Sequence, residues 1–205
     1  MDSQVLPSPS TVPTPPPITP IDFPADLPAG MRLHIGGKVR VPGWTVLDIA
    51  PGAHVDIQGD CSDLSAVADG SCSVVYASHV IEHLGYDLAL PRALKEFHRV
   101  LAAGGQVMVA VPDLEILCRL FILPELTLDE RFHIMRMMFG GRTDAYDVHL
   151  VGLNTEFVAA FLNQAGFVAL RRVKDFGLFP DNSSNTFSGC PVSLNVIGRK
   201  PMRAA

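Results

Sequence analysis

The stretch Ser73-Val-Val-Tyr-Ala-Ser-His-Val-Ile-Glu-His-Leu84 carries the strongest structural signal in the chain. Its apolar run from Val74 to Ala77 has the composition that a buried strand needs. Polar side chains at the carboxyl end of such a strand are typical of ligand sites in open α/β sheets. The polar residues that follow this run are Ser78, His79, Glu82 and His83.

The residues after this stretch complete a strand–helix–strand unit. Residues 87–101 are predicted to be helical, because Leu90, Leu94 and Phe97 fall on one face. A Gly-Gly pair ends this helix, and residues 106–111 form a second buried strand. Such a unit nearly always has parallel strands and a right-handed crossover, so we predict an α/β fold.

Further strands are predicted on both sides of this unit. The first two strands are separated only by residues 36–44, which is short for the helix of a parallel crossover. We therefore expect the first helix of the fold to be shortened or replaced by a loop. The predicted strands are Met31 to Ile35, Thr45 to Ile49, Val55 to Ile57, residues 167–173 and residues 192–197.

Residues 114–139 show a helical pattern that Pro124 interrupts. Thr127 and Glu130 have the spacing of a capping box, which predicts that the second helix begins there. We expect the apolar side chains of this helix to pack in the core. They are Leu128, Phe132, Met135, Met138 and Phe139.

A last helix is predicted from Asn154 or Thr155, either of which can cap it, to a stop at Gly166. Its apolar residues are expected to face the core. They are Phe157, Phe161 and Leu162.

Composition limits the domain organisation and the partners. Residues 1–30 hold nine of the 17 prolines, so we predict a disordered or polyproline-II tail before one domain at 31–205. The net charge of −5 argues against nucleic acid, and no apolar run is long enough to span a membrane. The N-terminus lacks the pattern of a signal peptide, and the four cysteines form no CxxC pair. We therefore expect a cytoplasmic protein with reduced thiols.

The order and spacing of these pieces resemble the class I S-adenosylmethionine-dependent methyltransferases, and more narrowly a bacterial branch of predicted methyltransferases. This resemblance implies a Rossmann-like, mostly parallel seven-stranded sheet whose last strand is antiparallel. The segments that carry it are Asp48-Ile-Ala-Pro51, Gly59-Asp60 with Asp63-Leu64, Tyr76 to His79 with Glu82-His83, Arg99 to Gly105, Leu33 to Lys38, and Ser193 to Val196.

The resemblance also implies positions for the cofactor, S-adenosyl-L-methionine. A glycine turn lets the backbone approach its amino-acid end, an acceptor carboxylate binds its ribose, and a second carboxylate binds its adenine. The first turn departs from the family pattern in two ways. Lys38 replaces the second glycine of Gly-x-Gly, and His34 replaces a common acidic residue. Lys38 either pairs with the cofactor's carboxylate or points to solvent. The implied cofactor-binding residues are Gly36, Gly37, Lys38, Asp48, Asp60, Cys61, Ser78 and His79.

The polar cluster His79-x-x-Glu82-His83 has three interpretations. It matches the HxxEH pattern of an inverted zinc-protease motif, which requires a long helix and a third ligand. It also resembles a Glu-x-x-Glu-His run that holds a divalent ion in some methyltransferases, with His79 in place of the first glutamate. The third interpretation is that Glu82 and His83 only satisfy local backbone groups. The expected site contains no metal ligand.

Methyl transfer to a hydroxyl acceptor needs alignment and a base, and a histidine is the natural base near neutral pH. The candidates are His79, His83 and His149, in that order, and Glu82 belongs to the same catalytic cluster. The helical insertion at 114–150 is expected to cover the acceptor pocket, and the acceptor is expected to be a small molecule or a glycan. A non-catalytic binding or scaffold protein with the same fold is the alternative, and the altered first turn favours it.

Overall fold

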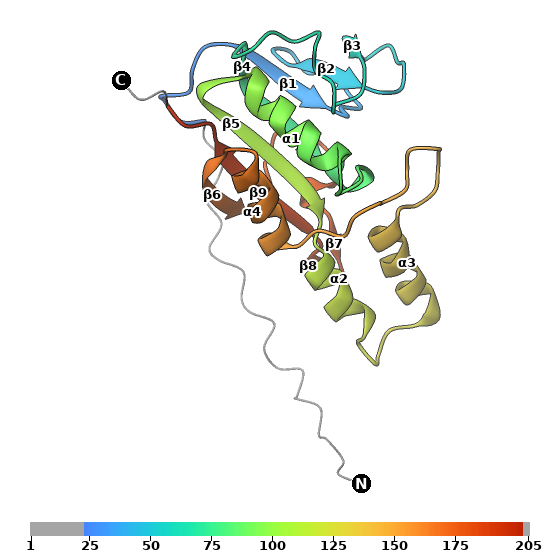
Figure 1. Ribbon diagram of the computed structural model, residues 1–205. Helices are drawn as coiled ribbons and strands as arrows, with labels where there is room; N and C mark the ends of the chain where they lie inside the picture. The colour runs from blue at the N-terminus through green and yellow to red at the C-terminus, as the bar shows by residue number, and fades with distance from the viewer. Residues whose placement is uncertain (1–22, 203–205) are drawn as a thin grey trace.

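The computed structural model describes residues 23–202, and its centre is one seven-stranded sheet (Figure 1). The strand order is β3-β2-β1-β4-β5-β9-β6. Neighbouring strands from β3 to β5 are parallel, whereas β9 is antiparallel to both β5 and β6. This confirms the predicted sheet. The strands are β1 (Met31–Ile35), β2 (Thr45–Asp48), β3 (Ile57–Gln58), β4 (Cys72–Ser78), β5 (Leu101–Pro112), β6 (Val168–Val173) and β9 (Ser193–Arg199).

The helices are unevenly distributed along the chain. Loops alone connect β1, β2, β3 and β4, so the shortened first helix of the prediction is a loop. The short hairpin of β7 (Thr186–Phe187) and β8 (Cys190–Pro191) precedes β9. The helices are η1 (Ile81–His83), α1 (Ala89–Val100), α2 (Leu114–Phe121), α3 (Leu128–Phe139), α4 (Thr155–Gln164) and η2 (Asn182–Ser184).

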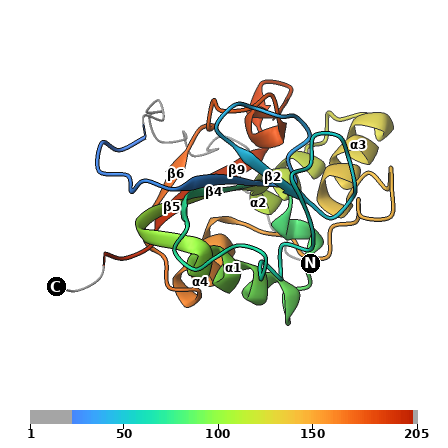
Figure 2. The same ribbon diagram turned by 90° about the horizontal axis from the view of Figure 1, so that it is seen from above.

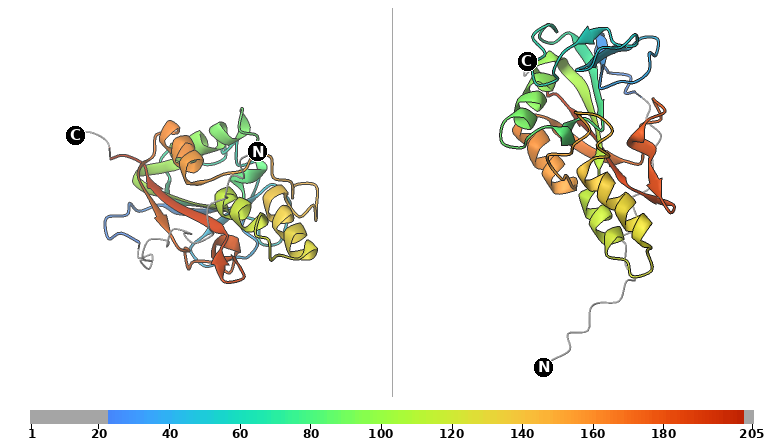
Figure 3. Two further views of the ribbon diagram at one scale, coloured as in Figure 1. Left: turned by 90° about the horizontal axis from the view of Figure 1, so that it is seen from below. Right: turned by 90° about the vertical axis from the view of Figure 1, so that its right-hand side faces the viewer.

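The two faces of the sheet are covered differently. Helices α1 and α4 lie on one face, as Figure 2 shows, and their apolar sides join the larger core cluster with the strands. Loops and the segment that precedes β1 cover the opposite face with aromatic side chains. Helices α2 and α3 pack on each other and extend beyond the sheet at the carboxyl end of β5 (Figure 3).

Three sequence-based expectations need correction. Residues 23–30 are not part of a tail, because Phe23 and Leu27 pack on the loop-covered face and Asp26 pairs with Arg199 at 2.8 Å. Residues 1–22 lie outside the described part of the chain. Phe157 is half exposed, while Val158 takes the inward position on α4. The apolar residues of α3 are also largely outside the core, since Leu128, Phe132 and Phe139 are exposed.

The helix caps were predicted more accurately than the apolar faces. Thr127 accepts a hydrogen bond from the backbone N–H of Glu130, whose carboxylate accepts one from the backbone N–H of Thr127. This is the predicted capping box. Asn154 rather than Thr155 caps α4, because its side chain accepts from the N–H of Phe157.

An aromatic cluster around His34 anchors the loop-covered face. The imidazole ring lies 4.0 Å from the ring of Phe179 and 5.0 Å from that of Tyr76, measured between centroids, and Trp44 closes the cluster. His34 is 4 % exposed, and this burial lowers its pKa to about 4. The neutral ring therefore belongs to the core, which explains why no acidic residue stands at this position.

His34 predicts a specific loss of stability in acid. The unfolded chain binds the imidazole proton near pH 6.5 and the folded chain only near pH 4, so the stabilisation by neutral His34 is complete above pH 6.5 and is lost as the pH falls towards 4. We expect roughly 2–3 kcal/mol of this loss between pH 7 and pH 4.5. Urea unfolding at both pH values should show a smaller loss for His34→Phe than for the wild type. Equal losses would contradict the assignment, and His133→Phe on the exposed face of α3 serves as the control.

Candidate functional site

The carboxyl ends of four strands meet at one edge of the sheet. Ile35, the last residue of β1, pairs with Leu47 of β2 and with Ala77 of β4. The residues that follow these three are Gly36, Asp48 and Ser78, so the register places them at the same level. Asp48 in turn pairs with Gln58 of β3, from which the chain continues to Asp60. Four of the positions predicted to bind the cofactor therefore lie along one edge.

The first turn at this edge has room only for glycine. Gly36 adopts a positive φ of +70°, and a Cβ atom on it would lie 2.6 Å from Cγ2 of Val80. A Cβ atom on Gly37 would lie 2.7 Å from Nδ1 of His34. The turn thus presents bare backbone beside β4. The Ser78 hydroxyl oxygen, at the neighbouring strand end, is buried and has no hydrogen-bond partner in the described part of the chain.

Asp48 is a buried carboxylate at the tip of β2, 5 % exposed. Its Oδ1 atom accepts a hydrogen bond from the N–H of Ala50 at 2.8 Å. Its Oδ2 atom accepts one from Nζ of Lys38, also at 2.8 Å. The side chain of Lys38 is 76 % exposed, so this ion pair lies at the surface and contributes little stability.

The loop after β3 supplies the last two predicted positions. Asp60 is exposed, and its Oδ1 atom accepts from the N–H of Ser62 at 2.7 Å, which leaves the other oxygen to solvent. The Cys61 side chain is 7 % exposed within the larger core cluster, and burial raises the pKa of its thiol to about 12. Cys61 therefore offers its backbone to a ligand rather than its sulfur.

A cavity of about 280 Å³ opens beside the end of β4, between the helical insertion and the loops before β9. His79, which directly follows Ser78, lines it. The cavity is rich in histidine and carries both signs of charge. Its other lining residues include His83, His133, Arg136, Asp147, His149 and Ser193.

His79 has a strained backbone, one hydrogen-bonded ring nitrogen and one that faces Glu82. Its φ is +54°, which is uncommon for a residue other than glycine. The Ser193 hydroxyl donates to the carbonyl of Asn182 at 2.6 Å, so the same oxygen accepts the N–H of His79 Nε2 at 3.1 Å. Nδ1 of His79 lies 3.3 Å from Oε1 of Glu82. The basic nitrogen of a neutral His79 is therefore Nδ1, which faces Glu82.

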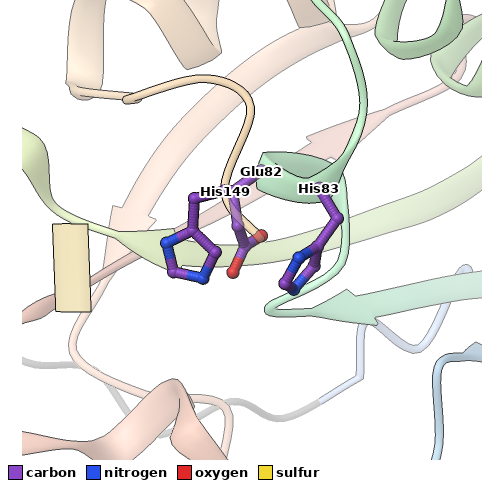
Figure 4. Close-up of side chains that lie close together, drawn as sticks. All are labelled: Glu82, His83 and His149. Atoms are coloured by element: carbon purple, nitrogen blue, oxygen red, sulfur yellow. The ribbon is translucent and has the colours of Figure 1, made fainter. Parts of the chain in front are cut away.

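Glu82, His83 and His149 lie together, as Figure 4 shows, and the two histidines line the cavity. Burial opposes ionisation of Glu82, but the neighbouring His79 and His83 outweigh it and keep the pKa of this carboxyl below its ordinary value. For His149, burial is the main effect, and it lowers the pKa of the imidazole. The site therefore combines a carboxylate with a neutral imidazole at pH 7.

Comparisons with known proteins agree with this geometry. Residues 45–109 match the family of the methyltransferase domain. That segment runs from β2 into β5 and includes Asp48, Asp60, Ser78 and the His79 cluster. Over these residues the chain is similar to that family.

Several solved structures of methyltransferases share the fold of this chain. A methyltransferase from Thermotoga maritima, described as a possible histamine N-methyltransferase, is 18% identical with a TM-score of 0.55, over 85% of this chain and 83% of that one. A putative methyltransferase from Haloferax volcanii, solved with the activator Trm112, is 14% identical with a TM-score of 0.51, over 86% of each chain. The N-methyltransferase NodS from Bradyrhizobium japonicum, solved with S-adenosyl-L-homocysteine, is 16% identical with a TM-score of 0.50, over 84% and 78%. No curated protein matches the chain.

The edge of the sheet suits S-adenosyl-L-methionine in most respects. The bare glycine turn and the unpartnered hydroxyl of Ser78 are the kinds of group that a bound nucleoside and amino acid would meet. Asp48 suits the ribose, although Lys38 occupies one of its oxygens in the free protein. Because that lysine is exposed, its movement away from Asp48 costs little.

Sequence reasoning found part of this site and missed part. His149 was placed third among the candidate bases, whereas the structure brings it into direct contact with Glu82 and His83. The sequence gives no role to His133 or Asp147, and Ser193 stands out only as part of the closing segment. Among the described helices, none is both long and apolar enough to cross a membrane.

Proposed function

We propose that the domain transfers a methyl group from S-adenosyl-L-methionine to a hydroxyl or amine of a small-molecule or glycan acceptor. The acceptor would bind in the cavity of about 280 Å³. One observation carries this proposal. Ser78 at the sheet edge and His79 in the cavity wall are consecutive residues, so the cavity adjoins the place where the resemblance puts the sulfonium group.

Each residue at the sheet edge has a proposed task. The backbone of Gly36 and Gly37 receives the amino-acid end of the cofactor, and Lys38, once released from Asp48, pairs with its carboxylate. Asp48 accepts hydrogen bonds from the ribose, and Asp60 with the backbone of Cys61 binds the adenine. The cofactor supplies a methyl group on a positively charged sulfur. Ser78 and His79 fix its direction towards the cavity, and alignment of this kind lowers the barrier substantially.

Removal of the acceptor's proton is assigned to His83 rather than to His79. Both nitrogens of His79 face other protein atoms, which makes it a positioning residue for Glu82. The Nδ1 atom of His83 lies 3.1 Å from the carbonyl oxygen of Val148, so this nitrogen carries the hydrogen. The lone pair is then on Nε2 of His83, a residue that lines the cavity. The ionised Glu82 beside it stabilises the imidazolium that forms.

The helical insertion sets the chemistry of the acceptor. His133, Arg136 and Met137 of α3 line one side of the cavity, and Asp147 lies on the loop that follows. The guanidinium of Arg136 donates a hydrogen bond to the carbonyl of Gly141, which keeps it near the cavity. A wall of this composition favours a polar acceptor with hydroxyl groups over an apolar one.

Ligand binding tests the proposal without knowledge of the acceptor. Saturation with S-adenosylmethionine or S-adenosylhomocysteine at about 100 times Kd should stabilise the protein by roughly 2.7 kcal/mol. For a chain of this size that is a rise of about 5–10 °C in Tm. A thermal-shift titration measures it, with adenosine and methionine as separate controls. A Tm unchanged by both cofactor forms would contradict the proposal, and a lysate screen with labelled methyl donor would then be unwarranted.

A non-catalytic binding or scaffold protein is the second candidate, and the ion pair between Lys38 and Asp48 favours it. If this pair closes the ribose position, the wild type will not respond to the cofactor, and Lys38→Met will. If Lys38 instead pairs with the cofactor's carboxylate, as we propose, Lys38→Met will bind more weakly than the wild type. The same titration separates the two outcomes.

A further inference from the structure

Three side chains from two distant segments converge on one point. Glu82 and His83 belong to η1, and His149 lies on the loop after α3, 66 residues beyond His83. Each offers one ligand atom, and these atoms lie within 4.8 Å of one another. Figure 4 shows the carboxylate between the two imidazole rings. The convergence is fixed by the backbone, because the N–H groups of Leu150 and Val151 both donate to the carbonyl of Glu82.

The Glu82 carboxylate is buried without a hydrogen-bond partner. The residue is 1 % exposed, and neither oxygen accepts a hydrogen bond from the part of the chain that the structure describes. Nδ1 of His79 lies 3.3 Å from Oε1 but does not form a hydrogen bond with it. Buried carboxylates are normally paired with donors or coordinate a metal, since an isolated charge is costly.

Both histidines are held so that a lone pair remains available. Nδ1 of His83 lies 3.1 Å from the carbonyl of Val148, and Nδ1 of His149 lies 3.2 Å from the carbonyl of Met138. A carbonyl can only accept, so both Nδ1 atoms carry hydrogen and both Nε2 atoms are acceptors. Metal-binding histidines almost always have this second contact, which fixes the tautomer and the ring orientation.

The cluster therefore brings together a carboxylate and two nitrogen lone pairs, and no group of residues 23–202 donates a hydrogen bond to that carboxylate. Three acceptors so close repel one another unless a cation lies among them. We propose that Glu82, His83 and His149 bind a divalent transition-metal ion whose remaining coordination positions open into the cavity. Ligand atoms bound at about 2.1 Å to one ion lie roughly 3–4 Å apart, so small rotations of these side chains complete the site.

The ligand set indicates the kind of ion. Two imidazoles and one carboxylate suit Zn²⁺, Co²⁺, Mn²⁺ or Fe²⁺ better than Mg²⁺ or Ca²⁺, which prefer oxygen. Three protein ligands leave at least one position open, as in catalytic rather than structural sites. An oxygen of the acceptor fits that position, because His83 and His149 line the cavity. This use of the ion rests on the proposed function and would replace direct proton removal by His83, because its Nε2 lone pair cannot serve both roles. Binding of the ion itself does not rest on the proposed function.

Metal titration of the full chain tests the proposal. Tag-free protein, stripped with a chelator, is titrated with Co²⁺ by visible absorption and with Zn²⁺ by calorimetry, without cofactor or acceptor. We expect one ion per chain and visible Co²⁺ bands from nitrogen and oxygen ligands. Glu82→Gln and His149→Asn should each weaken binding by more than about tenfold, the smallest effect that loss of a mere supporting contact has at metal sites. His133→Gln, on the same cavity but outside the cluster, should bind like the wild type.

Several outcomes overturn the proposal. Wild-type protein that takes up neither ion overturns it, and so does uptake that survives both ligand variants, because the ion would then lie elsewhere. Urea unfolding of Glu82→Gln identifies a folding defect at this buried position, and the less buried His149→Asn then decides the question. The metal titration contains no methyl donor, so its result does not depend on whether the protein transfers methyl groups. A failure of metal binding likewise does not contradict the proposed methyl transfer.

Discussion

Asp48→Asn should weaken the binding of S-adenosylhomocysteine by about 30- to 1,000-fold, or roughly 2–4 kcal/mol. The buried carboxylate lies at the tip of β2, where the proposed ribose would donate one or two hydrogen bonds to a charged acceptor. An amide keeps the shape and can still accept from the N–H of Ala50. It cannot accept charge-assisted bonds through both atoms. Calorimetry measures the loss, and Asp129→Asn, in the exposed first turn of α3, is the matched control.

Lys38 bears on the size of this effect. In the free protein its ammonium group occupies Oδ2 of Asp48, so the ribose has to displace it. An ion pair with so exposed a lysine contributes about 0–1 kcal/mol, which is less than the expected loss. The substitution therefore still reports on the ribose contact. Equal affinities for the wild type and Asp48→Asn would place the ribose elsewhere.

The sheet was predictable because its strands are short buried runs bounded by glycine or polar clusters. The β4 segment has no exposed residue, and such continuous apolar composition is what a strand between two parallel neighbours needs. The missing helix after β1 was predictable as well, because residues 36–44 are too few for a helical crossover. The length of this first connection does not predict that loops also connect β2 to β3 and β3 to β4, where helices would be expected.

The exposed faces of α3 and α4 show where pattern reasoning failed. Helix α4 begins at its Asn154 cap, and its inward positions are Val158 and Leu162, four residues apart. Phe157 is apolar, but its position around the helix axis turns it away from the core. Helix α3 packs through Ile134, Met137 and Met138 in a small cluster with α2, Val192 and Phe187, so its other apolar residues do not cover the sheet. Helical periodicity predicts a face but not whether a partner lies against it.

The cluster at the cavity needed the three-dimensional structure. Glu82 and His83 are neighbours, and their spacing from His79 suggested chemistry from the sequence alone. His149 joins them only because the loop after α3 folds back. The backbone N–H of His149 donates to the carbonyl of Phe139, and the next two backbone N–H groups donate to the carbonyl of Glu82. Backbone hydrogen bonds across such a separation leave no local signal in a single sequence.

His83→Ala should lower the turnover number by about 10²- to 10⁴-fold, the usual contribution of a positioned proton acceptor. The assay is transfer of labelled methyl to the acceptor that a lysate screen identifies. The affinity for S-adenosylhomocysteine should be unchanged, because His83 lines the cavity and not the glycine turn. His54→Ala, which changes a histidine that does not line the cavity, should retain the turnover. Unchanged turnover in His83→Ala would remove this residue from the mechanism.

Loss of turnover alone does not separate a bare base from a metal ligand, since both roles need the Nε2 lone pair of His83. A chelator separates them. If the ion binds the acceptor's oxygen, stripping the wild type should reduce its turnover to about the level of His83→Ala, and Co²⁺ or Zn²⁺ should restore the wild type but not the variant. If His83 takes the proton directly, the stripped wild type keeps its turnover. His83→Ala thus tests whether the histidine is needed for turnover, and the chelator tests whether it acts by binding a metal ion.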